Sequence, residues 1–114
     1  MIALKVKTQY RSEFVDITGD VAKAVRKIGI SDGIVLIYCP HTTAGITINE
    51  NADPSVLTDI NLKTSKFIDH NDPDYRHGEG NSDSHIKSSF FGASETVIIE
   101  RGKLVLGTWQ GIFF

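Results

Sequence analysis

The stretch of residues 41–54, His-Thr-Thr-Ala-Gly-Ile-Thr-Ile-Asn-Glu-Asn-Ala-Asp-Pro, constrains the fold more than any other part of the chain. It begins where an apolar run ends at Pro40. It ends at Asp53-Pro54, a strong helix start, because aspartate caps helices and proline is tolerated in the first turn. Between these limits lie an imidazole, three threonine hydroxyls, the carboxylate of Glu50 and two carboxamides. Such a density of hydrogen-bonding groups indicates either a functional site or a well-satisfied turn.

The first part of the chain shows clear apolar periodicity. Alternation over residues 2–8 predicts a half-buried strand, which we expect to form a hairpin with residues 14–17. Thr18 is expected to cap a helix that ends near Gly29, a residue suited to the left-handed position after a helix. Residues 34–39 are apolar without alternation, which predicts a central strand covered on both faces.

The second part continues the pattern. We expect a strand over residues 45–50, an amphipathic helix over 54–68 and a long polar loop over 70–83. A short helix capped by Asp83 follows over 84–91, and the final strands lie at 96–99 and 103–114. Runs of strands and helices in this order predict an α+β fold, with a mainly antiparallel sheet or sandwich and helices packed on one face. The length of 114 residues suits a single domain.

Composition excludes several classes of partner. The net charge is −2 and no basic block is present, so nucleic acid and anionic membranes are poor candidates. No segment approaches the roughly 20 apolar residues that span a bilayer, so we expect a cytoplasmic protein. The single cysteine, Cys39, cannot form an intrachain disulfide and is interpreted as a small core residue rather than a nucleophile.

The histidines are the first candidates for chemistry. His41 follows a buried strand, His77 lies in a glycine-flanked loop, and His85 falls in the predicted short helix. Neutral imidazole is a good ligand for zinc and similar ions, so a metal site would form if these three meet in space. Their spacing matches no known metal motif, and each is equally compatible with a rim or loop histidine. His70 is interpreted as a partner of a helix dipole.

The carboxylates and lysines supply further candidates. Glu50 lies at a strand end between two asparagines, where it is either functional or held by neighbouring donors. Asp59 lies on the polar side of its helix. Lys87 could neutralise an anion, and the backbone N–H groups near Asn81 could contribute to the same task.

Three stretches together resemble the YjbQ-like family, also described as a secondary thiamine-phosphate synthase family. They are residues 41–54, residues 79–89 (Glu-Gly-Asn-Ser-Asp-Ser-His-Ile-Lys-Ser-Ser) and residues 106–111 (Leu-Gly-Thr-Trp-Gln-Gly). The resemblance covers essentially the whole chain. It implies a small α+β fold that assembles as a homotrimer, with a pocket near the subunit contacts. Family members usually continue beyond the tryptophan motif with an acidic segment and a further strand, so residues 1–114 are expected to form one domain without that strand.

The resemblance also implies site residues. His41, His77 and His85 would bind a divalent metal, zinc or alternatively magnesium, while Glu50, Asp59 and Lys87 would be catalytic. The pocket would take a small-molecule ligand and would be lined by a further polar set: Thr42, Thr43, Asn51, Glu79, Asn81, Trp109 and Gln110.

Two hypotheses for function follow. The first is a metal-dependent enzyme with weak thiamine-phosphate synthase activity, a transferase that joins a pyrimidine diphosphate to a thiazole phosphate. Its leaving pyrophosphate would need a cation or several basic groups. The second is a non-catalytic trimeric module that binds a metal or a metabolite. A closed four-ligand metal site would favour the second hypothesis and an open coordination position the first.

Overall fold

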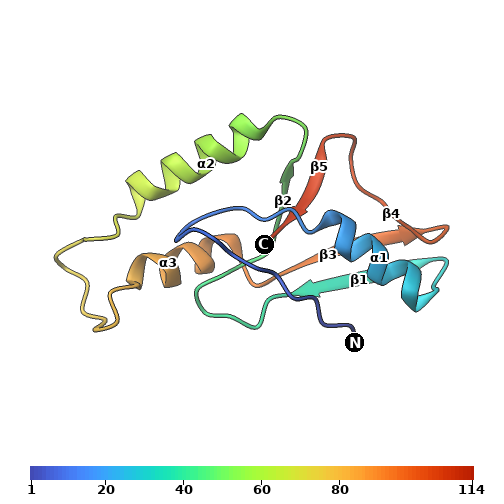
Figure 1. Cartoon of the computed structure of the whole chain (residues 1–114), viewed down its shortest axis with the longest axis horizontal. Helices are drawn as coiled ribbons and strands as arrows, with labels where there is room; N and C mark the ends of the chain where they lie inside the picture. The colour runs from blue at the N-terminus through green and yellow to red at the C-terminus, as the bar shows by residue number, and fades with distance from the viewer.

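The structure is a computed structural model that describes residues 1–114. Eight elements follow one another: α1 (Thr18–Ile28), β1 (Gly33–Tyr38), β2 (Thr47–Glu50), α2 (Pro54–Phe67), α3 (Ser82–Phe91), β3 (Ser94–Glu100), β4 (Lys103–Leu104) and β5 (Gln110–Phe113). They form an elongated body of 51 × 29 × 21 Å (Figure 1). None of the three helices has the length and apolar character needed to cross a bilayer.

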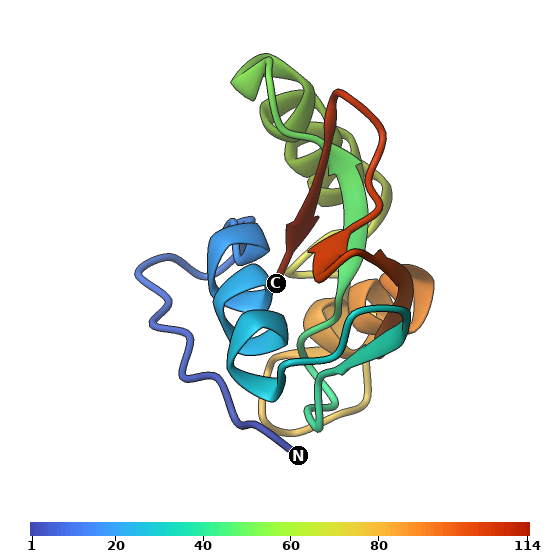
Figure 2. The ribbon, with the colours of Figure 1, turned by 90° about the vertical axis from the view of Figure 1, so that its right-hand side faces the viewer.

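All strand pairs are antiparallel. One sheet has the order β1-β3-β4, and β2 and β5 form a second, two-stranded sheet. The predicted α+β class with antiparallel sheets is therefore confirmed. Helix α1 covers one side of the strands, and the N-terminal segment, residues 1–15, passes outside α1 (Figure 2). The core lies between α1 and the sheets and is made of Ile17, Val21, Ile37, Cys39, Ile46, Val97 and Ile112.

The predicted N-terminal hairpin is wrong. Residues 2–8 form no strand, and the backbone groups of residues 15–17 pair with β5 instead: Val15 N–H donates to Phe114 O at 2.8 Å and Ile17 N–H donates to Ile112 O at 2.9 Å. Phe14 also packs edge-to-face on Phe91 and Phe113. A strand partner distant in sequence thus replaces the local one, because only β5 places these apolar side chains in the core.

Two predicted caps are also wrong. Thr18 is the first residue of α1 rather than its cap; its hydroxyl donates to Asp16 at 2.6 Å and accepts from the N–H of Ile112 at 2.8 Å. Asp83 lies in the first turn of α3, which begins at Ser82. The predicted cap at Asp53 is confirmed, since its carboxylate accepts from Ser55 N–H at 2.9 Å.

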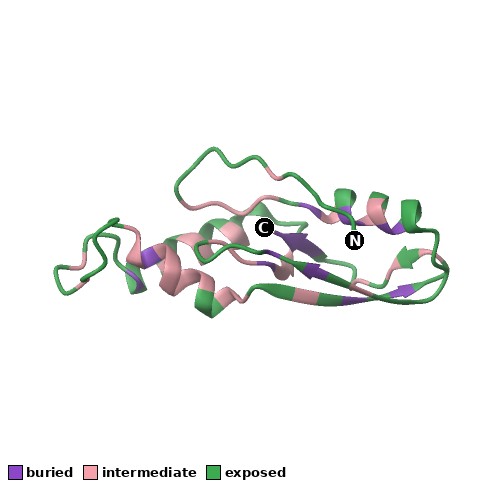
Figure 3. Ribbon diagram, turned by 90° about the horizontal axis from the view of Figure 1, so that it is seen from below, coloured by how far each residue is buried: buried purple, intermediate pink, exposed green.

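The strand β1 is not covered on both faces as predicted. Its inward residues Val35 and Ile37 meet the core, whereas Ile34, Leu36 and Tyr38 are each more than 60 % exposed. They lie opposite Ile98, Thr96 and Ser94 of β3. No helix or strand lies beyond this side of the sheet (Figure 3). We call Ile34, Leu36, Tyr38, Thr96 and Ile98 the outer sheet face.

The polar stretch contains a glycine, Gly45, at a position with no room for a side chain. A Cβ at this position would lie 2.5 Å from the carbonyl oxygen of Gly92, which ends α3. The backbone of Ile46 donates to the same oxygen at 3.0 Å. Residues 41–47, here called the rim segment, can approach α3 this closely only because residue 45 has no side chain.

We expect Gly45→Ala to lower the free energy of unfolding by about 2 kcal/mol, because an added methyl group forces the rim segment away from α3. Urea unfolding followed by circular dichroism measures this change. Gly19→Ala is the matched control: nothing lies within 4 Å of a Cβ there, and alanine in a helix is favoured over glycine by ~1 kcal/mol. A Gly45→Ala variant as stable as the parent would contradict this account of the close approach.

Candidate functional site

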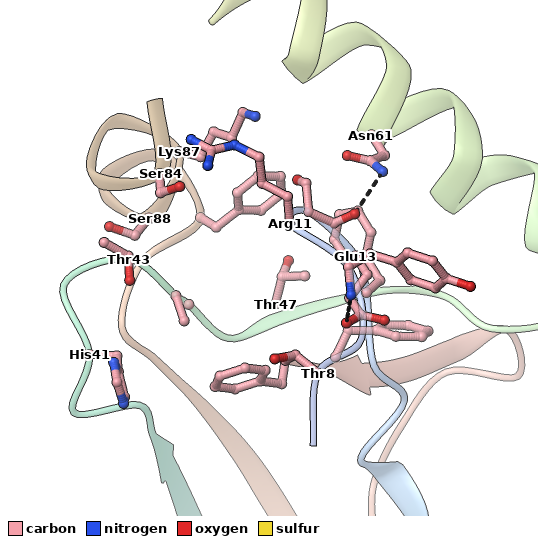
Figure 4. A pocket seen from close by; sticks show the side chains of 18 of the residues that line it. Thr8, Arg11, Glu13, His41, Thr43, Thr47, Asn61, Ser84, Lys87 and Ser88 are labelled. Carbon is pink, nitrogen blue, oxygen red and sulfur yellow. Dashed lines mark hydrogen bonds between the residues drawn. The ribbon is translucent and has the colours of Figure 1, made fainter. Parts of the chain in front are cut away.

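One cavity of the chain lies where three distant segments meet. Its walls are the N-terminal segment, the rim segment and α3, with additional contributions from α2 and the C-terminal residues; we call it the rim cavity (Figure 4). Its volume is about 410 Å³, within the range of small-molecule sites. The lining includes a mostly polar set: Thr8, Arg11, Glu13, His41, Thr43, Thr47, Asn61, Thr64, Ser84, Lys87 and Ser88.

The rim segment is fixed to α3 by polar bonds. The hydroxyl of Ser88 donates to the carbonyl of Thr42 at 2.6 Å, and the same oxygen lies 2.9 Å from the carbonyl oxygen of His85. Asn61 of α2 donates to the carbonyl of Ser12 at 3.2 Å, which attaches the N-terminal segment to α2. These bonds to backbone carbonyls help to fix the walls of the cavity.

Several polar groups in the cavity have no protein partner. The imidazole of His41 and the hydroxyls of Thr43, Thr47 and Ser84 make no side-chain hydrogen bond, although all four residues line the cavity. Thr47 stands near the centre of the view in Figure 4, with His41 and Thr43 on one side. His41 and Thr43 are exposed and Thr47 and Ser84 are half-buried, so these free donors and acceptors are accessible to a polar ligand.

A buried carboxylate lies behind one end of this cavity. The side chain of Asp83 is 2 % exposed and is held by two cations: Arg11 Nη2 at 2.7 Å and Lys87 Nζ at 3.3 Å. Arg11 Nη2 also lies 2.6 Å from His70 Nδ1 and donates to the carbonyl of Gly80 at 3.3 Å. A buried charge needs such partners, because desolvation without them is costly.

The pKa of Asp83 reflects this balance. Burial on its own raises the pKa of the carboxyl, but the hydrogen bonds from Arg11 and Lys87 and the charges of both outweigh it, so the pKa is lowered below the usual value. Asp83 is therefore ionised at neutral pH and holds both cations in place.

The structure separates the predicted site residues. His41, Thr43 and Lys87 line the rim cavity, and Thr42 anchors it through its carbonyl. His77 and His85 line a second depression, with ring centroids 5.2 Å apart, together with Asp74, Tyr75, Arg76, Ser82 and Ile86. Glu79 is exposed and lies 3.6 Å from His77. The residues predicted to form one pocket therefore lie around two separate depressions.

The remaining predicted residues lie outside the rim cavity. Glu50 accepts from the N–H of Asp53 at 3.3 Å, which makes it part of the turn before α2, and Asp59 is exposed on α2. Asn51 donates to Asp16 at 3.1 Å, and Gln110 accepts from the N–H of Gly107 at 2.8 Å. Trp109 is 63 % exposed. Asn81 precedes α3, and its side-chain oxygen is buried without a partner.

The expected three-histidine metal site is not formed. No group of three or more histidine, cysteine, aspartate or glutamate side chains is arranged to hold a metal ion. The physical reason is topological, since His41 lies at the end of β1 while His77 and His85 lie before and within α3, around a different depression. Three imidazoles must each lie ~2 Å from a shared zinc ion, which this placement does not allow within one chain. The zinc or magnesium cofactor stays a prediction without a ligand set in this chain.

Arg11, Asp83 and His70 were not identified as a unit from the sequence. Arg11 occurs in a segment with no periodicity, and His70 was interpreted as a helix-dipole partner. The available signal was the spacing of Asp83 and Lys87, four residues apart on one helix, which places opposite charges side by side. Arg11 joins them from 72 positions away, which no local pattern indicates.

Comparison with known proteins assigns the family. The model described as "UPF0047 protein YjbQ-like" matches residues 2–114. The chain belongs to the YjbQ-like UPF0047 family. It is 56 % identical to a UPF0047 protein of Methanocaldococcus jannaschii over 96 % of this chain and 79 % of the relative. It is 52 % identical to the UPF0047 protein YugU of Bacillus subtilis, over 97 % of this chain and 84 % of the relative.

Solved structures of the YjbQ-like family share this fold. A crystal structure from Clostridium acetobutylicum, described as an uncharacterised conserved protein of the YjbQ/UPF0047 family, is 56 % identical with a TM-score of 0.93, over 96 % of this chain and 84 % of that chain. A YjbQ-like protein of unknown function from Sulfolobus solfataricus is 38 % identical with a TM-score of 0.89, over 95 % and 78 %. The predicted family is confirmed.

The prediction of thiamine-phosphate synthase activity is wrong, because the names of the related proteins give no such activity. The YjbQ-like relatives are named only as UPF0047 proteins, and one of the solved structures is described as of unknown function. The chemistry was also attached to a three-histidine metal pocket, which the chain does not form. Function has to be argued from the rim cavity itself.

We expect stability to fall on acidification because of Asp83. Its folded pKa is lowered, so its contribution is fully present above the unfolded value of about 4 and is lost as the pH falls through the folded pKa. Asp83→Asn should lower the free energy of unfolding at neutral pH by about 3 kcal/mol, since it leaves two cations without their buried partner.

Urea unfolding at several pH values measures both effects. The difference between the parent and Asp83→Asn should be largest at neutral pH and should shrink below pH ~4. Asp16, Asp32 and Asp53 also have lowered pKa values. Their contributions to the pH dependence are the same in both proteins, so they cancel in the difference between the two free energies of unfolding. A difference that does not change with pH would show that the charge of Asp83 is unimportant.

Proposed function

We propose that this chain binds a small polar molecule in the rim cavity. The observation that carries the proposal is the set of unpartnered groups on the cavity wall, the imidazole of His41 and the hydroxyls of Thr43, Thr47 and Ser84. A cavity of about 410 Å³ with apolar residues such as Val6, Phe91 and Phe113 among these groups resembles small-molecule sites in general. The cytoplasmic location expected from the sequence is kept as part of this proposal.

An enzymatic role is the second candidate, and His41 favours it. The exposed His41 side chain lines the cavity, with both ring nitrogens free of protein partners. Histidine is the side chain best suited to moving a proton near neutral pH, and a free imidazole facing a ligand is the arrangement that general acid–base catalysis needs. In this role His41 would give or take a proton at a hydroxyl or carbonyl of the bound molecule.

Binding is tested by thermal shift against a panel of nucleotides, sugar phosphates, amino acids and organic acids. We expect at least one class to raise the melting temperature of the parent and not that of His41→Ala, because the imidazole faces the ligand. His85→Ala is the matched control, since it makes the same substitution in the second depression. The proposal fails if no class stabilises the parent, or if His85→Ala removes binding and His41→Ala does not.

We also propose that the chain functions as a homo-oligomer, as the family resemblance implies with its homotrimer. Support comes from the outer sheet face, where Ile34, Leu36 and Tyr38 are 67 %, 63 % and 63 % exposed and Ile98 is 59 % exposed. Contiguous exposed apolar residues of this kind mark interaction surfaces. The strand β1 is also an edge strand, with backbone groups free to pair.

We expect light scattering after size exclusion to give three times the chain mass of 12.6 kDa. Leu36→Asp should shift the protein toward monomer, because it places a charge in the apolar contact. Ile28→Asp is the control, a similar change at an exposed position on α1, which lies on the other side of the sheet. A parent protein that elutes as a monomer at micromolar concentration would overturn the oligomer.

A further inference from the structure

We infer that one end of the rim cavity is an oxyanion site, which receives a phosphate or carboxylate group of the bound molecule. This inference rests on the proposed function and adds the chemical class of the ligand. Its basis is the pairing of Arg11 and Lys87, here called the cation pair, beside the unpartnered hydroxyl of Ser84. Figure 4 shows these three side chains together at one end of the cavity, away from His41.

The cation pair carries an excess of positive charge. One buried carboxylate, Asp83, serves both Arg11 and Lys87. His70 contacts both Arg11 and Asp83, and the carbonyl of Gly80 accepts from Arg11; neither contributes a negative charge. The side chain of Lys87 is only 14 % exposed, so its charge is weakly screened by water and favours a second anion.

Both cations keep donors without a protein partner. All of the hydrogen bonds of Arg11 start from Nη2, to His70, the carbonyl of Gly80 and Asp83, so its Nε and Nη1 groups have no protein acceptor. Lys87 has three N–H groups and makes one bond, to Asp83. Arginine and lysine donors around a shared point are the usual means of binding phosphate and carboxylate.

Helix α3 adds a hydroxyl at the right spacing. Ser84 and Ser88 lie three residues before and one after Lys87, on the side of α3 that faces the cavity. The hydroxyl of Ser88 is committed to backbone carbonyls, whereas that of Ser84 has no partner. Ser84 can therefore donate to an oxygen of the same anion that Lys87 binds.

Glu13 gives the cavity a direction. It is the only carboxylate in the lining, and one of its oxygens accepts from the backbone N–H groups of Gln9 and Tyr10, the latter at 2.9 Å. In Figure 4 it lies apart from Lys87, on the Thr8 side of the cavity. An anionic group is therefore repelled from the Glu13 side and attracted to the cation pair, which orients a ligand that carries its charge at one end.

Asp83 is a positioning residue for this site. It is too buried to touch the ligand, but it fixes the ends of Arg11 and Lys87 within hydrogen-bonding distance of a single carboxylate. Holding the two cations in place before binding reduces the entropy that the ligand must offset. Without Asp83 the two like charges would repel each other and the N-terminal segment would lose its bond to α3.

The experiment is a ¹H–¹⁵N NMR titration of the full chain with inorganic phosphate, and separately with succinate, with chloride used to hold the ionic strength constant. We expect the amide signals of Ser84 and Lys87 and the Nε–H signal of Arg11 to shift and saturate at millimolar anion. Lys87→Met, which keeps the side-chain length without the charge, should weaken this binding about tenfold. Lys103→Met, on β4, is the matched control and should bind as the parent does.

The two anions decide between the possible groups. Saturation with phosphate only assigns a phosphate-bearing ligand, and saturation with succinate only assigns a carboxylate-bearing one; either outcome supports the oxyanion site. Lys87→Arg, which keeps the charge, should retain binding and shows that a loss in Lys87→Met is not unfolding. No saturable shift with either anion overturns the inference. The proposed function still stands in that case if a neutral compound shifts the signals of Thr47 and His41, and fails if none does.

Discussion

The ion cluster around Asp83 is the interaction on which the rest of the site depends. Arg11 brings the N-terminal segment to α3, and Lys87, one turn further along α3, binds the same carboxylate and lines the cavity. The N-terminal segment has no strand or helix over residues 1–15, so beyond the pairing of Val15 with Phe114 its course relies on a few side-chain bonds. One buried carboxylate therefore joins parts of the chain that are 72 residues apart and forms the wall of the cavity.

Local patterns predicted much of the fold. The apolar run that becomes β1, the Asp53-Pro54 start of α2 and the glycine that ends α1 all operate within a few residues, so they can be recognised without knowing the rest of the chain. The order of the expected strands and helices predicted the α+β class, which the structure confirms. For the site, the polar stretch before β2 contributes His41 and Thr43 to the lining of the rim cavity.

Long-range pairing limited the remainder. Residues 2–8 alternate, which predicted a hairpin with residues 14–17, yet Val15 and Ile17 pair with the C-terminal residues instead. Three histidines suggested one metal site, but the connection through α2 takes His77 and His85 to a different depression from His41. Arg11 lies in a segment that carries no periodic signal, so its partnership with Asp83 depends on tertiary structure. The strand β1 was predicted to be covered on both faces, but one face is uncovered. A strand that is apolar on both faces suits a surface that another copy of the chain covers.

The most direct test of this account is the pKa of Asp83, measured by ¹³C NMR of its carboxyl carbon during an acid titration of the full chain. The account gives a pKa below the ordinary aspartate value of about 4, because Arg11 and Lys87 stabilise the ionised form more than burial destabilises it. A measured pKa at or above that value would show that the two cations do not hold this carboxylate. The cavity would then lack the preorganised charge on which the oxyanion site rests.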